Sequence, residues 1–325
     1  MSLYHYSIYG LRLEADRPIP GLSAGRGRLR PDVRLRLGSM PSRLDEKLER
    51  AEAFYESAGV DEHGRPSLTC SRLDDGKYIR LLYRDGTEFV IDRAGSRVWA
   101  CWAEPATVED TALYLLGAVM GLVLRLRGKA CLHASVIRIG DRAIALAGAS
   151  GSGKSTTAAA FARLGFSILS DDVAPLSYER GRFMIDAGYP RLRLWPESVR
   201  SLYGSTDALP LLTQGWSKRY LNLNEDGYSF QQEALPLAAV YLLGERTGAP
   251  EAPTVRPVSK QAAVIDLLAN AYAGYFLDKA MRAEEFELLT RLADRVPVRL
   301  LEPSSDFDRL TRMCGLITDD LAEYV

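Results

Sequence analysis

The stretch Ala143-Ile-Ala-Leu-Ala-Gly148-Ala-Ser-Gly-Ser-Gly-Lys154-Ser155-Thr156 decides the fold. Residues 148–155 match the phosphate-loop pattern G-x-x-x-x-G-K-[ST] at every fixed position. An apolar run predicted to be a strand leads into the glycines at 144–147, and an apolar run predicted to be a helix leads out of them at 157–164. This context separates a phosphate loop from a chance run of glycine and serine. The sequence therefore predicts an α/β nucleotide-binding fold.

The residues of this loop have separate expected tasks. The glycines let successive backbone N–H groups turn toward phosphate oxygens, and the helix that begins near Lys154 directs its positive dipole end to the same place. Lys154 is expected to reach the β- and γ-phosphates, and the Ser155 hydroxyl is expected to bind Mg²⁺. The predicted nucleotide contacts are Gly148, Ser150, Gly151, Ser152, Gly153, Lys154, Ser155 and Thr156.

Two adjacent acids, Asp171 and Asp172, follow the next predicted strand at residues 166–169. A carboxylate at the end of a buried strand beside a phosphate loop can hold Mg²⁺, and a second one can accept the proton of an attacking hydroxyl. Aspartate is also common in turns and helix caps, where its role is structural. Because the pair follows a phosphate loop so closely, we interpret both acids as functional.

A histidine and several basic residues are further candidates. His133, one of three histidines, falls on a predicted strand at 131–139 and can point toward the loop, although a lone histidine is more often structural. Positive side chains can neutralise the charge on a transferring phosphoryl group, but basic residues are also common on surfaces. The candidates of this kind are Lys218 and Arg219, in a predicted loop, and Arg191 and Arg193, on one face of a predicted strand.

Bulk properties restrict the class of protein. The 325 residues are 47% hydrophobic and 26% charged, with a formal net charge of −1, which is typical of a folded globular protein. Lys and Arg are spread along the chain, so no nucleic-acid partner is expected. The first residues lack a signal-peptide pattern, and the apolar run at 111–124 is shorter than the roughly 20 residues that span a bilayer. Four cysteines without a CxxC pair favour a reducing cytoplasm, with no membrane partner.

Two domains are predicted. Residues 1–105 carry β-prone runs separated by turn signals, together with one expected exposed helix at 41–58, and form a β-rich amino-terminal domain. A capping box at Thr107 and an apolar run ending at Gly128 predict a buried helix that opens the second domain, 106–325. Strands are expected at 4–9, 33–37, 78–83, 88–91, 97–102, 131–139, 143–147, 166–169, 173–178, 182–187, 189–194, 219–223 and 237–243, and helices at 154–164, 196–203, 260–273, 280–295 and from 305 onward.

The order of His133, the loop from Gly148 to Thr156, and Ser170-Asp171-Asp172-Val173 resembles the HPr kinase/phosphorylase family over about residues 130–180. The resemblance implies a P-loop kinase core related to phosphoenolpyruvate carboxykinase, which uses ATP and Mg²⁺ to phosphorylate a serine hydroxyl. It further implies that Asp171 is the general base, that Asp172 is a Mg²⁺ ligand, and that His133 orients Asp171 or contacts phosphate. Lys218 or Arg219 is expected to assist.

Over most of its length the chain is similar to the HPr kinase-like proteins encoded beside lasso-peptide biosynthesis genes, on the segments 4–14, 18–22, 171–175 and 189–196. Those relatives phosphorylate a serine at the end of a precursor peptide. The resemblance therefore implies a peptide or protein substrate, which the amino-terminal domain is expected to help to hold. Two alternatives stay open: a nucleotide switch without a phosphate acceptor, and a kinase of small hydroxyl compounds. An oligomeric state is compatible with the peptide kinase and with both alternatives.

Overall fold

The computed structural model describes residues 2–25 and 30–324 of a mixed α/β protein with several sheets. The chain folds into two compact units. The amino-terminal unit comprises the residues up to Lys129 together with Ala273–Leu277, and the carboxy-terminal unit comprises Ala130–Tyr272 and Asp278–Val325. The division thus falls later than the predicted boundary after residue 105, because the helical segment that follows Thr107 belongs to the amino-terminal unit.

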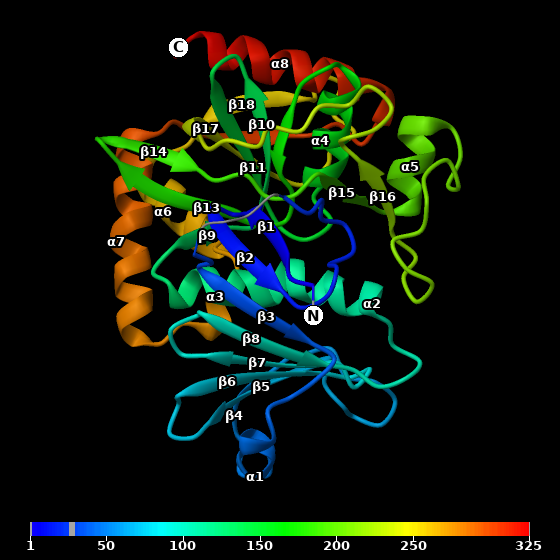
Figure 1. Ribbon diagram of the computed structural model, residues 1–325. Helices are drawn as coiled ribbons and strands as arrows, with labels where there is room; N and C mark the ends of the chain where they lie inside the picture. Colours follow the sequence, from blue (N-terminus) through cyan, green and yellow to red (C-terminus); the bar gives the residue numbers. More distant parts are fainter. Residues whose placement is uncertain (1, 26–29, 325) are drawn as a thin grey trace. The chain divides into compact units, whose positions relative to one another are not determined.

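The amino-terminal unit is built on an eight-stranded sheet with the order β1-β2-β3-β8-β7-β6-β5-β4 (Figure 1). Buried apolar residues alternate with more exposed polar ones along strands such as β2 and β3, which gives the sheet one apolar face. The strands are β1 Tyr4–Ile8, β2 Leu11–Ala15, β3 Val33–Leu37, β4 Glu52–Glu56, β5 Leu68–Leu73, β6 Tyr78–Tyr83, β7 Glu88–Asp92 and β8 Arg97–Cys101.

The predicted helix at 41–58 is wrong over its second half. Only the short helices η1 (Ser42–Leu44) and α1 (Asp45–Leu48) are helical, whereas Glu52–Glu56 forms strand β4 and pairs antiparallel with β5. Strand β4 is the last strand of the sheet and is largely exposed. Charged residues suit a solvent-facing edge strand as well as a helix, so their spacing did not distinguish the two.

The capping box at Thr107 is confirmed. The Thr107 side chain accepts a hydrogen bond from the Asp110 backbone N–H, and the Asp110 carboxylate accepts one from the Thr107 N–H at 3.0 Å. The helical segment then runs through α2 (Val108–Tyr114), the π-helix η2 (Leu115–Val119) and α3 (Met120–Leu126). The unit also contains the short helix η3 (Gly274–Phe276). Its helical segment contacts the turn between β1 and β2 through the buried Tyr9 hydroxyl, which donates to the Leu116 carbonyl at 3.0 Å.

The carboxy-terminal unit has a nine-stranded sheet with the order β12-β10-β11-β17-β14-β13-β9, to which β19 and β18 add beside β17. Strands β11, β17 and β19 are parallel neighbours, so their carboxyl ends meet at one edge of the sheet. The strands are β9 Ala130–Leu132, β10 Ala134–Ile139, β11 Arg142–Ala147, β12 Ile168–Ser170, β13 Ala174–Glu179, β14 Arg182–Ile185, β17 Leu235–Leu243, β18 Thr254–Pro257 and β19 Val298–Glu302. A separate two-stranded sheet contains β15 Arg191–Leu194 and β16 Arg219–Asn222.

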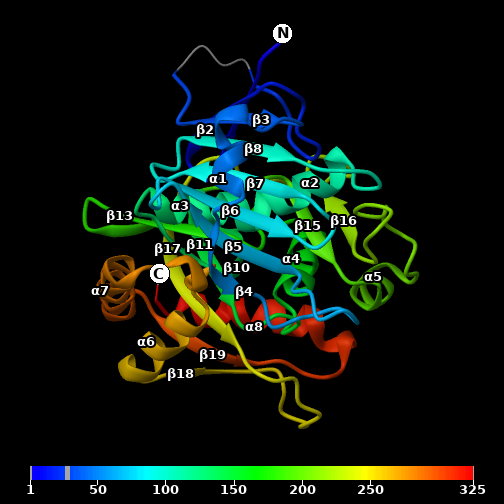
Figure 2. The same ribbon diagram turned by 90° about the horizontal axis from the view of Figure 1, so that it is seen from below.

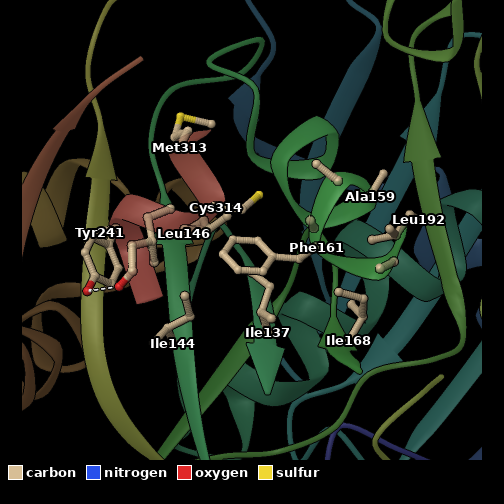
Figure 3. Close-up of a cluster of buried hydrophobic side chains, with 14 of the residues drawn as sticks. Ile137, Ile144, Leu146, Ala159, Phe161, Ile168, Leu192, Tyr241, Met313 and Cys314 are labelled. Carbon is tan, nitrogen blue, oxygen red and sulfur yellow. Dashed lines mark hydrogen bonds between the residues drawn. The ribbon is translucent and has the colours of Figure 1, made fainter. Parts of the chain in front are cut away.

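Helices cover both faces of this sheet, as Figures 1 and 2 show. On one face, Ile144 and Leu146 of β11 pack with Phe161 of α4 and with residues of α5 and α8 (Figure 3). On the other face, Ala143 and Ala145 of the same strand pack with residues of α6 and α7. The helices are α4 Lys154–Arg163, α5 Pro196–Tyr203, α6 Lys260–Ala269, α7 Lys279–Arg295, η4 Phe307–Arg309 and α8 Leu310–Ala322.

The alternation along β11 explains why a continuous apolar run forms this strand. A strand that is covered on both faces needs apolar side chains at every position rather than at every second one. The predicted helix at 196–203 agrees with α5 at both ends. Strands β18 and β19 were not predicted from the sequence.

Candidate phosphate-binding site

The loop between β11 and α4 turns sharply on glycines. Gly151 and Gly153 have φ angles of 84° and 106°, in the left-handed region that other residues rarely adopt. Gly153 is the N-cap of α4, so the first turn of that helix begins at the end of the loop. The loop therefore brings backbone N–H groups and a helix amino terminus to the carboxyl end of a central parallel strand, where open α/β sheets bind their ligands.

Lys154 lies across the loop and is 6% exposed. Its ammonium group donates hydrogen bonds to the carbonyls of Gly148 at 2.7 Å and Ala149 at 2.9 Å. Burial lowers the pKa of this ammonium from its ordinary value, and the nearby carboxylates of Asp171 and Asp172 oppose that shift. The lysine is thus a desolvated positive charge in a cavity that also contains two acids.

Asp171 directly follows β12 and is 5% exposed. Its Oδ1 accepts hydrogen bonds from the hydroxyls of Ser155 at 2.9 Å and Ser135 at 2.6 Å, and its Oδ2 accepts one from the Arg193 backbone N–H at 3.2 Å. One carboxylate therefore connects the phosphate loop with β10 and β15.

Asp172 faces a different set of partners. Its carboxylate lies 2.7 Å from Arg193 Nη2 and 3.1 Å from His133 Nδ1, and it accepts a hydrogen bond of 3.5 Å from the Tyr272 hydroxyl. Burial alone would raise the pKa of the Asp172 carboxyl, but Arg193 and His133 outweigh it and hold the pKa well below its ordinary value. Asp172 has a φ of 75°, a backbone strain that its fixed surroundings stabilise.

His133 does not lie on a strand, and its imidazole contacts the Asp172 carboxylate. The predicted strand at 131–139 breaks at this residue, because β9 pairs with β13 while β10 pairs with β11 and β12. The His133 backbone N–H instead donates to the Asn270 carbonyl at 2.8 Å. The imidazole lies 3.1 Å from the Asp172 carboxylate, whereas the resemblance implied that it orients Asp171 or contacts phosphate.

The loop and both acids line one cavity of about 170 Å³. Gly148 lies at the base of the loop, where its carbonyl holds Lys154, and Ser152 faces a separate, smaller cavity. The predicted site residues that line the larger cavity are His133, Ser150, Gly151, Gly153, Lys154, Ser155, Thr156, Asp171, Asp172 and Lys218.

The basic candidates divide into two groups. Arg193 and Lys218 line the cavity, and Lys218 Nζ lies 4.5 Å from the centroid of the exposed Trp195 ring. Burial, and next Arg193, lower the pKa of the Lys218 ammonium. Arg219 is instead bound to the Asp207 carboxylate and to the Leu209 carbonyl. Arg191 stacks over the Tyr220 ring at 4.2 Å.

Several residues that line or support the cavity were not singled out from the sequence. Ser135 is a buried hydroxyl within an apolar strand, which is a detectable signal because such a group needs a partner. Ser198 bonds the Thr156 hydroxyl at 2.8 Å, and Trp195 lies at the start of α5. Arg246, which follows β17, gave no signal in the sequence.

The donor set of this cavity fits Mg²⁺. The Ser155 hydroxyl and the carboxylates of Asp171 and Asp172 are hard oxygen ligands, the kind that this cation prefers. Within residues 2–25 and 30–324, no cluster of three or more His, Cys, Asp or Glu side chains is arranged to hold a metal. Such a site suits an ion that a few protein oxygens hold together with the phosphates of a substrate.

No protein-family model matches the sequence, and no curated protein matches it. Among the helices that the structure describes, none combines the length and apolar character needed to cross a membrane. Among solved structures, the chain is similar to the Hpr(Ser) kinase/phosphatase from Coxiella burnetii, with a TM-score of 0.34 and 12% sequence identity over 59% of this chain and 91% of that chain.

Proposed function

We propose that this chain is a kinase that uses ATP and Mg²⁺ to phosphorylate a serine hydroxyl of a peptide or protein. The observation that carries the proposal is a single cavity lined by the phosphate-loop lysine, the loop serine and two consecutive acids. The hydrogen bond of 2.9 Å from the Ser155 hydroxyl to the Asp171 carboxylate joins the phosphate loop to the acid pair. Nucleotide binding alone requires only the loop, whereas phosphoryl transfer also requires a group that accepts a proton.

The loop supplies the binding step. Backbone N–H groups and the amino terminus of α4 stabilise the polyphosphate, and Lys154 leaves its two carbonyl partners to contact the β- and γ-phosphates. Since the lysine already lies in the cavity, little rearrangement is needed. Fixed positive groups in a desolvated cavity stabilise the charge of the transition state more than groups in water do.

The acids divide the remaining work. Mg²⁺, when bound, neutralises phosphate charge, and the Ser155 hydroxyl and Asp172 carboxylate are its proposed protein ligands. Because its pKa is held so low, Asp172 stays ionised and is a poor proton acceptor. Asp171 is therefore the proposed general base. If the Ser155 hydroxyl were to bind the metal, Asp171 Oδ1 would keep only the hydroxyl donor of Ser135 and could accept the proton of the acceptor hydroxyl.

His133 and Lys218 complete the acceptor side of the cavity. The imidazole fixes the Asp172 carboxylate, and the Lys218 ammonium is placed to neutralise charge on the transferring group. Arg219 has no direct part in this proposal, because its guanidinium is bound to Asp207. A precursor peptide of the lasso type is the proposed acceptor, on the similarity of the segments at 4–14, 18–22, 171–175 and 189–196.

A transfer assay separates this proposal from its alternatives. The protein is incubated with Mg²⁺, ATP labelled at the γ-phosphate, and three acceptors: a serine-ended precursor peptide, the same peptide with alanine in place of serine, and a panel of small hydroxyl compounds. Label on the serine peptide alone supports the proposal. Free phosphate with no labelled acceptor indicates a nucleotide switch, and label on a small compound indicates the small-molecule kinase.

A further inference from the structure

Arg246 is a basic residue of the cavity that the proposed mechanism does not yet use. It follows β17, the parallel neighbour of the strand that leads into the phosphate loop. Its guanidinium lies against Gly153, where an added Cβ would be only 2.8 Å from Arg246 Nη2. The guanidinium therefore lies directly on the N-cap of α4, at the end of the loop opposite to the carbonyls that hold Lys154.

The charge of Arg246 has no acidic partner among residues 2–25 and 30–324. Burial alone lowers the pKa of its guanidinium, with no contribution from a neighbouring carboxylate. The side chain is held by Phe307, whose ring centroid lies 4.4 Å from the guanidinium carbon. A partly buried cation that is held in place without an anion is poised for an anionic ligand.

The position of Arg246 indicates which part of the ligand it meets. It lines the larger cavity with the acids, and it also lines a smaller cavity of about 10 Å³ between the loop and residues 303–313, which is lined by Asp306 but by neither Asp171 nor Asp172. The phosphoryl group that is transferred must face the two acids. The remaining phosphates then lie on the side of the larger cavity that borders the smaller one, which is the side that Arg246 lines.

We infer that Arg246 binds the non-transferred diphosphate part of the nucleotide, as a second cation beside Lys154, and that Phe307 positions its guanidinium. This inference rests on the proposed function. It assigns Arg246 to binding of the ground state rather than to the transfer step, because ADP and ATP share the group that it contacts. Loss of the Arg246 side chain consequently weakens the binding of ADP and of ATP by the same factor. It leaves the rate of transfer at saturating ATP nearly unchanged.

The test measures dissociation constants of MgADP and MgATP by calorimetry for Arg246→Ala, Arg246→Lys and Phe307→Leu. If Arg246 makes a charge-assisted contact with the diphosphate, Arg246→Ala should raise the dissociation constants of both nucleotides by about 10- to 100-fold. Its kcat should stay within about threefold of that of the unchanged protein. Arg246→Lys and Phe307→Leu, which keep a positive charge near the loop, should lose less. Arg256→Ala is the matched control, since Arg256 is 57% exposed and lines neither cavity.

Equal affinity of Arg246→Ala and the unchanged protein for MgADP would overturn the inference, provided that both have the same thermal unfolding midpoint. A fall in kcat without a change in affinity would overturn it as well, because Arg246 would then act on the transferred group. If the unchanged protein binds nucleotide but labels no serine peptide, the kinase proposal fails while the affinity comparison still decides the role of Arg246. If the unchanged protein binds no nucleotide, both fail.

Discussion

Replacing Arg193 with Gln tests how the acid pair is held. The Arg193 and Asp172 side chains are 14% and 24% exposed, and their charged atoms lie 2.7 Å apart. Loss of one partner of a buried ion pair leaves an uncompensated charge and costs about 3–5 kcal/mol. Because solvent reaches part of Asp172 and His133 remains beside it, we expect a loss of about 2–3 kcal/mol in the free energy of unfolding at pH 7.

The pH dependence of this loss has a definite sign. Arg193 holds the pKa of Asp172 below the ordinary aspartate value of about 3.9. The stabilisation is therefore fully present above about pH 4, and it is lost as the pH falls through the folded-state pKa. In Arg193→Gln the folded-state pKa of Asp172 rises toward its ordinary value. The difference in stability between the two proteins should thus be largest at neutral pH and should shrink below about pH 4.

Urea unfolding, followed by circular dichroism and tryptophan fluorescence, measures both effects. Arg191→Gln is the matched control, because Arg191 lies on the same strand but stacks on Tyr220 without an acidic partner in β15 or β16, and its loss should cost under about 1 kcal/mol. If Arg193→Gln is no more destabilising than Arg191→Gln, or if its cost is the same at pH 7 and pH 3, the electrostatic account of Asp172 is wrong.

Three further substitutions test the loop, the base and the support of the base. Lys154→Ala should weaken ATP binding at least about tenfold by calorimetry and abolish serine labelling, because phosphate charge is left uncompensated; normal turnover would contradict the loop assignment. Asp171→Asn should lower transfer by at least about 100-fold while ATP affinity changes by less than about threefold, whereas a joint loss would assign Asp171 to metal binding or folding. Ser135→Ala should lower the free energy of unfolding in urea by about 1.5 kcal/mol, since it removes a buried donor to a carboxylate, and an effect as small as that of the partly exposed control Ser177→Ala would refute this.

Part of the site could be predicted from the sequence because its residues are close together in the chain. One stretch of about twenty residues contains the phosphate loop, the strand before it and the helix after it, and Asp171 and Asp172 follow the next strand. Each depends on glycine conformation, apolar periodicity or a short spacing. The helix at α5 was equally readable, since Pro196 begins it and Gly204 ends it.

The remaining parts depend on pairings between distant segments. The break at His133 arises because two strands that are adjacent in sequence pair with different partners, and no local pattern encodes that choice. Arg246 reaches the loop only because β17 pairs in parallel with β11, nearly a hundred residues earlier in the chain. The spacing of the charged residues in β4 also fits a helix, and only the pairing of β4 with β5 identifies this segment as a strand.

The most direct test of the central claim is a crystal structure of the protein with Mg²⁺ and a non-hydrolysable ATP analogue. The account predicts that the triphosphate is enclosed by the backbone N–H groups of residues 148–155, with Lys154 at the β- and γ-phosphates and the Asp171 carboxylate facing the terminal phosphorus. A nucleotide bound elsewhere, or a terminal phosphate directed away from Asp171 and Asp172, would contradict it.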